Sequence, residues 1–259
     1  MQSFFLVFLS ILNLGVVSQS AKTSLAPSGS DHVSVQRRKI VVVRPAKLQK
    51  AFPHKKRATI TYPVISGLSD PVTLRRVRSL FDFKNIFDYS LKEYREDTWL
   101  DEFDYEVNYN QNSLLDITFR QSGSAAYPDD QQKHFLVDLT NGRVVKASDA
   151  FEPHKLPSLA VLVDGRLQDE LRQDAKDLAS SKDSDPQELE SIKQAYENLK
   201  FEVTNLDDFS VGPAGVTFLY DAGFPHVIRA LEPAGRYFFN WAEIKPYIKP
   251  NGPLAQFVR

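Results

Sequence analysis

Histidine and cysteine, the side chains that most often bind transition metals, are sparse in this sequence. The absence of cysteine excludes disulfides, zinc–thiolate sites and a thiol nucleophile. The five histidines form neither an H-x-x-x-H pair nor the H-E-x-x-H motif of zinc peptidases. We therefore predict no metal site and no cofactor. The histidines are His32, His54, His134, His154 and His226.

Carboxylates offer the other chemistry that the spacing allows. Asp101, Glu102 and Asp104 form one group, and Asp129 and Asp130 form another. Neither group has the alternating ligands and the glycine of a calcium-binding loop. Two carboxylates can also hydrolyse glycosides, but their separation depends on the tertiary structure, so the sequence singles out no pair. Since no G-x-S-x-G motif and no glycine-rich phosphate loop occurs, we assign no catalytic residue.

The segment 121–132 is the strongest candidate for a partner-binding surface. It is rich in Gly, Ser, Ala, Pro and Asp, which is typical of a long hairpin loop. Within it, Tyr127 is closely followed by Asp129 and Asp130. An exposed aromatic ring beside acidic groups suits a cationic protein or the face of a sugar, so we predict that these three residues bind the partner. The alternative is a structural loop in which Tyr127 packs on the sheet.

Alternating apolar and polar residues on both sides of this loop predict β-strands. The pattern covers 103–109, 115–119 and 135–139, and short connections favour antiparallel pairing. Between 159 and 199, apolar residues recur at three- and four-residue spacing in two stretches, the pattern of a helical hairpin. The predicted fold is α+β, with this helical hairpin packed on one face of an antiparallel sheet. Further strands are predicted at 58–64, 201–204, 215–220 and 236–241.

The N-terminal residues predict an exported protein. An apolar run over 4–17, followed by small residues up to Ala21, indicates a signal peptide at 1–21. An exported chain of 259 residues without cysteine must be stabilised by its hydrophobic core, and this combination is typical of the bacterial cell envelope. We expect a secreted or periplasmic protein.

The net charge of −1 hides a strong asymmetry. Residues 22–57 hold ten basic residues and one acidic residue, a net charge of +9, so the rest of the chain carries −10. We predict a basic flexible linker at 22–57 and a folded domain at 58–259. The linker would contact an anionic envelope polymer or phospholipid, or else fold back on the domain, while the acidic domain favours a cationic partner.

Several short motifs occur in the order and spacing of a known family. They are TYPVI from Thr61, SAAYP from Ser124, DLTNG from Asp138 and AEIKPYI from Ala242. On these motifs, the region 58–248 resembles the extracellular domain of the RsiV-like lysozyme-sensing anti-sigma factors. A similar module of unknown function precedes the catalytic domain of some peptidoglycan deacetylases. The family commonly has His in its Ala-x-Pro turn, where this chain has Tyr127.

The resemblance implies an α+β domain that recognises a ligand at the cell envelope. We therefore expect an exported, non-catalytic binding domain for a lysozyme-like cationic protein or for a cell-wall glycan such as peptidoglycan, with no nucleic-acid partner. Two alternatives stay open from the sequence. One is a carbohydrate-active cell-wall enzyme with an unrecognised carboxylate site, and the other is a structural envelope protein whose basic arm binds anionic polymer. The sequence predicts no oligomeric state.

Overall fold

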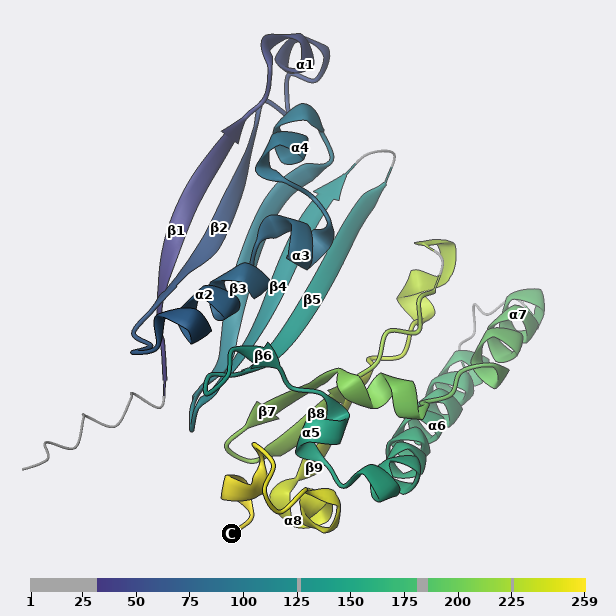
Figure 1. Ribbon diagram of the computed structural model, residues 1–259. Helices are drawn as coiled ribbons and strands as arrows, with labels where there is room; N and C mark the ends of the chain where they lie inside the picture. The colour runs from purple at the N-terminus through teal and green to yellow at the C-terminus, as the bar shows by residue number, and fades with distance from the viewer. Residues whose placement is uncertain (1–31, 125–126, 181–185, 225) are drawn as a thin grey trace, which may run out of the picture.

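The computed structural model of the protein describes residues 32–124, 127–180, 186–224 and 226–259 and contains two β-sheets (Figure 1). The larger sheet has six strands in the order β1-β2-β3-β4-β5-β6, and all neighbours are antiparallel except β2 and β3, which are parallel. The α+β class predicted from the sequence is confirmed, with a mixed sheet in place of a purely antiparallel one. The predicted signal peptide lies outside the described residues. The strands are β1 (Ser34–Val43), β2 (Arg57–Ser66), β3 (Leu100–Gln111), β4 (Leu114–Ser124), β5 (Pro128–Asp138) and β6 (Arg143–Val144).

Three short helices cover one face of the large sheet (Figure 1). They are α2 (Pro71–Leu80), α3 (Phe83–Phe87) and α4 (Leu91–Glu96). The Asp70 side chain caps α2, because it accepts hydrogen bonds from two backbone amides of the first turn. Under the helices, Phe81 packs against Phe119 and Phe135 with ring centroids 5.4 and 5.7 Å apart. These rings form the core between the helices and the sheet.

The predicted helical hairpin packs on a second, smaller sheet. This sheet is antiparallel and consists of β7 (Phe209–Gly212), β8 (Gly215–Leu219) and β9 (Arg236–Asn240). Leu159, Val163 and Leu167 of α6 (Leu156–Ser180) share one buried cluster with Phe218 and Phe239 of the small sheet. The second helix is α7 (Pro186–Glu197). The protein therefore has two cores where the sequence analysis expected one.

The remaining elements after β6 are short. The predicted strand at 201–204 was wrong, because its second half begins a 3₁₀ helix. Among the described residues, none of the helices combines the length and the apolar composition needed to span a bilayer. The short elements are α5 (Ala147–Ala150), η1 (Pro153–Lys155), η2 (Val203–Asp207), η3 (His226–Leu231), α8 (Trp241–Ile244), η4 (Lys245–Tyr247) and η5 (Ala255–Phe257).

The segment 121–132, predicted to be a long loop, belongs mostly to a β-hairpin. Strands β4 and β5 stay paired up to Ser124 and Pro128. The small residues that suggested a loop are required by packing, because a Cβ atom on Gly123 would lie 2.2 Å from the carbonyl oxygen of Trp99. The prediction of a loop was wrong because the sequence does not distinguish a glycine required where two backbone segments pack closely from a glycine required in a turn.

The predicted flexible linker at 22–57 is also corrected in its described part. Residues Ser34–Val43 form β1, which pairs with β2 along its full length, and Ala46–Ala51 form α1 at the end of this hairpin (Figure 1). The domain therefore begins before Ala58. The linker prediction relied on the excess of basic residues, but alternate side chains of an edge strand can stay in solvent while the backbone pairs.

The parallel pairing of β2 with β3 is short, because only two residue pairs are in register. Contacts from the β1 segment to β3 supplement this pairing. Near the middle of β1, Arg37 donates to the carbonyl oxygen of Tyr105 at 3.2 Å and pairs with Asp104. Just before β1, the backbone of Val33 exchanges hydrogen bonds of 3.0 and 2.7 Å with the side-chain amide of Asn110. Both contacts reach across β2 to β3 and so fix the N-terminal hairpin to the sheet.

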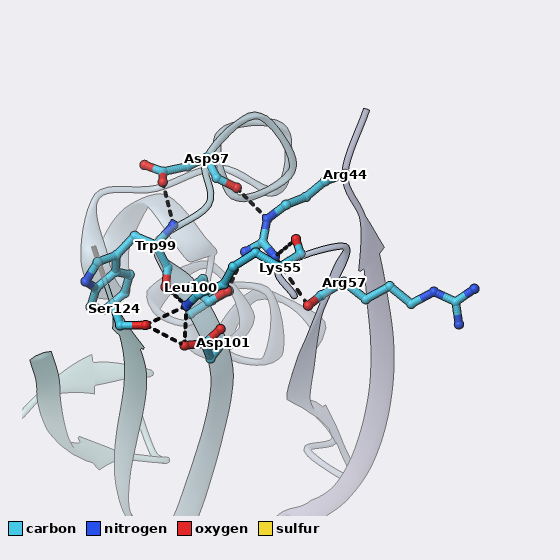
Figure 2. A network of polar contacts seen from close by, with 8 residues as sticks. All are labelled: Arg44, Lys55, Arg57, Asp97, Trp99, Leu100, Asp101 and Ser124. Carbon is cyan, nitrogen blue, oxygen red and sulfur yellow. Dashed lines mark hydrogen bonds and ion pairs between the residues drawn. The ribbon is translucent and has the colours of Figure 1, made fainter. Parts of the chain in front are cut away.

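Arg44 fixes the other end of this hairpin. It is 1% exposed, and Figure 2 shows its guanidinium surrounded by backbone oxygens. The guanidinium donates to the carbonyl oxygens of Asp97 at 2.6 Å, Lys55 at 2.5 Å and Arg57 at 3.3 Å, and also to that of Leu100. One buried cation therefore joins the α1–β2 connection to the start of β3.

Replacement of Arg44 tests this role. We expect Arg44→Met to lower the free energy of unfolding by about 3–5 kcal/mol, because it leaves several buried carbonyl groups without a donor. Arg38→Met, at an exposed position of β1, should change it by less than about 0.5 kcal/mol. Chemical denaturation of both variants measures the difference, and equal stabilities would contradict the role of Arg44.

Candidate binding site on the open sheet face

The face of the large sheet opposite α2, α3 and α4 carries polar side chains in cross-strand rows. In the upper row, Glu102 of β3 is paired with Ser122 of β4, and Ser122 with Asp130 of β5. In the next row, the pairs run from Asp104 through Arg120 to Gln132. Because directly paired residues of antiparallel strands project from the same face, these six side chains share one surface.

This surface is hollowed. The hollow has a volume of about 340 Å³. Asp104 of its wall pairs with Arg37, and Arg120 lies 3.3 Å from the carboxylate of Glu106. Neither Glu102 nor Asp130 makes an ion pair with any residue that the structure describes. The hollow is lined by Glu102, Asp104, Arg120, Gln121, Ser122, Asp130, Gln131 and Gln132.

The structure separates the three residues that the sequence analysis selected. Tyr127 lies at the end of the β4–β5 hairpin and is 67% exposed, so it does not pack on the sheet. Asp130 lines the hollow, whereas Asp129 pairs with Arg229 of η3. The hydrogen bond and the charge of that guanidinium hold the pKa of the Asp129 carboxyl below its usual value. The carboxylate of Asp129 is therefore already engaged in an ion pair within the protein.

The two carboxylate groups noted in the sequence meet at the hollow. Glu102 and Asp104 come from one group and Asp130 from the other, whereas Asp101 pairs with Lys55 beside Arg44 (Figure 2). The sequence analysis missed Arg120, and it covered Ser122 and Gln132 only as members of the segment 121–132. The alternation along β4 and β5 places these residues on the polar face, but their partners follow from the register, which the sequence did not specify.

Below the hollow, the same face is closed by a buried polar network. Asp116 of β4 is 0% exposed, and its carboxylate accepts hydrogen bonds from Asn108 at 2.6 Å and from the backbone amide of Val211 in β7 at 2.7 Å. The imidazole of His134 lies between two carboxylates, with Nε2 2.9 Å from Asp116 and Nδ1 2.8 Å from Asp208. This network joins the two sheets.

The network makes His134 a buried cation. Burial lowers the pKa of the imidazole, but the hydrogen bonds to Asp116 and Asp208 and their charges outweigh burial and raise it to about 9. Since both ring nitrogens are engaged by carboxylates, His134 has no free nitrogen with which to accept a proton from a substrate. Its role is structural. Among the described residues, no three His, Asp or Glu side chains are arranged to hold a metal ion.

Comparison with known proteins supports the fold. No protein-family model matches the sequence, and no curated protein matches it. A solved DUF3298-family protein from Bacteroides fragilis aligns with a TM-score of 0.53 and 13% identity over 89% of this chain and 99% of its own. A second DUF3298-family structure, from Pseudomonas aeruginosa PAO1, gives a TM-score of 0.48 and 13% identity over 85% and 94% of the two chains. The first alignment shows that this chain has a DUF3298-like fold.

The charge on His134 predicts how stability depends on pH. A group whose pKa is raised in the folded state stabilises the fold fully below its unfolded pKa, here about 6.5, and this contribution disappears as the pH rises through about 9. We expect the free energy of unfolding to fall by on the order of 3 kcal/mol across this window. In His134→Gln, the fall should be absent and the stability at pH 6.5 reduced. Equal pH profiles of the two proteins, measured by chemical denaturation, would contradict the assignment.

Proposed function

We propose that this protein is an exported, non-catalytic binding domain that recognises a cationic, lysozyme-like protein through the open face of its large sheet. The observation that carries the proposal is the hollow between Glu102 and Asp130, two carboxylates in one cross-strand row without an ion-pair partner among the described residues. A volume of about 340 Å³ has room for one lysine or arginine side chain. Such a side chain would bind both carboxylates at once.

Charge and exposure outside the hollow support the same kind of partner. Residues 58–259 carry a net charge of −10, which attracts a cationic protein over distances longer than direct contact. Tyr127 at the end of the adjacent hairpin offers an exposed aromatic ring, a residue type that often dominates binding at protein interfaces. The resemblance to lysozyme-sensing domains supports lysozyme as the first probe.

The surroundings of the carboxylates favour binding over catalysis. A general acid in a glycosidase needs a neighbourhood that keeps its carboxyl group protonated, usually an apolar pocket. Here Arg120 lines the hollow, and Asp104 is paired with Arg37. The hollow is thus lined by charged and polar side chains rather than by an apolar pocket, which suits recognition of a cation.

A cell-wall glycan is the second candidate ligand. The observation that favours it is the pair of uncharged polar groups in the hollow, the hydroxyl of Ser122 and the amide of Gln132. Groups of this kind exchange hydrogen bonds with sugar hydroxyls. Binding of a neutral glycan would depend little on salt, whereas binding of a cationic protein would weaken as salt is added.

Calorimetric titration with lysozyme tests the proposal. We expect binding that weakens from low to physiological salt. Glu102→Gln combined with Asp130→Asn should weaken it by about 10-fold, because two partly exposed ion pairs together contribute about 1.4 kcal/mol.

The matched control is Glu190→Gln combined with Glu197→Gln, which removes two exposed carboxylates from α7. This control should bind lysozyme like the parent protein. Absence of heat at both salt concentrations would exclude lysozyme as the partner. Equal losses in both double variants would show that only the overall charge matters and would remove the hollow as the site.

A further inference from the structure

The hairpin end formed by α1 and its flanking residues is strongly basic. No acidic residue occurs from His32 to Arg57, although this segment holds nine lysines and arginines. Three of these nine are engaged within the fold: Arg37 with Asp104, Arg44 with backbone carbonyls, and Lys55 with Asp101. Of the other six, Arg38 and Lys39 lie in the middle of β1, and the remaining four lie in α1 or next to β2's start. We call these four the basic tip. They are Lys47, Lys50, Lys56 and Arg57.

The side chains of the basic tip are free for a partner. All four residues are exposed, and none makes an ion pair with a residue that the structure describes. Figure 2 shows the side chain of Arg57 pointing away from the Arg44 cluster. The network of Figure 2 therefore fixes the backbone under the tip and leaves its charges in solvent.

Apolar side chains are exposed among these charges. Phe52, directly after α1, is 42% exposed and lies in the sequence between Lys50 and Lys56. Val41 and Val43, on the last residues of β1, are 56% and 44% exposed. Phe52 and the two valines thus add exposed apolar area to the four cations of the basic tip, at the end of the large sheet where Figure 1 places α1.

The tip is held in shape before any partner binds. Arg44 contacts the carbonyls of Lys55 and Arg57, which follow α1, while its own carbonyl accepts a hydrogen bond from Gln49 of α1 at 2.6 Å. The start and the end of the α1 connection are thereby fixed to the same residue. A surface that is already ordered loses less entropy on binding than a flexible linker would.

We propose that the basic tip docks on the anionic surface of a phospholipid bilayer. The three lysines and Arg57 lie over lipid phosphates, and Phe52 inserts at the level of the headgroups, where aromatic rings are favoured. The exposed apolar side chains favour a membrane over a soluble polyanion. A polyanion would be held by the four charges and would gain little from an exposed phenylalanine.

This docking is independent of the function proposed for the hollow, because it uses different residues and the opposite charge. The hollow begins close to the tip, since Glu102 is paired with Thr59, two residues after Arg57. A docked tip would therefore hold the acidic hollow near the membrane surface. A domain placed in this way would meet cationic proteins as they approach the bilayer.

Vesicle co-sedimentation of the full chain tests the proposal. We expect the parent protein to bind vesicles of phosphatidylcholine and phosphatidylglycerol more tightly than vesicles of phosphatidylcholine. Lys47→Gln, Lys50→Gln and Lys56→Gln together should weaken binding to the anionic vesicles by about 100-fold, since each basic residue near an anionic surface contributes about fivefold. Phe52→Ser should weaken it further.

The matched control removes three exposed lysines at a distance from the tip, by Lys176→Gln, Lys193→Gln and Lys200→Gln. This control should bind anionic vesicles like the parent, and both triple variants should keep the parent's thermal unfolding temperature. Equal weakening by the two triple variants would overturn the proposal. So would unchanged binding of Phe52→Ser to vesicles together with tip-dependent binding to soluble polyphosphate, because the ligand would then be a polyanion.

Discussion

Asp116 is a fully buried carboxylate on which the assembly of the two sheets depends. It accepts hydrogen bonds from Asn108 of β3 and from the amide of Val211 in β7, and it faces the imidazolium of His134 in β5. A buried charge of this kind is tolerated only when its oxygens are satisfied by donors or by an opposite charge. The contacts that satisfy Asp116 come from both sheets, so they also determine how the sheets meet.

This arrangement divides the polar face of the large sheet into two parts. The lower part, with Asp116 and His134, is used to join the small sheet. The upper part keeps exposed charges, among them Glu102 and Asp130 at the two ends of one cross-strand row. Arg44 and the α1 connection hold the neighbouring hairpin in place beside this upper part. An acidic hollow and a basic tip can therefore lie near each other on one rigid sheet, each open to a different partner.

Much of the fold could be predicted from local patterns. Strands β3, β4 and β5 and helix α6 each bury one face, so their apolar residues show a clear period. Strand β1 was assigned to the linker because it is an edge strand, and the consecutive charges at Arg37, Arg38 and Lys39 conceal its alternation. The site was found in part. Asp130 was selected for its type, but its approach to Glu102 depends on strand register, which is a property of the whole sheet.

The central claim is that the upper part of the open sheet face is the binding surface. Amide hydrogen exchange of the full chain, measured with and without lysozyme, tests it most directly. The account predicts slower exchange in the described ends of β4 and β5 around Ser122 and Asp130, with no change in α6 and α7. Slower exchange confined to α6, α7 or the helices over the opposite face would contradict it.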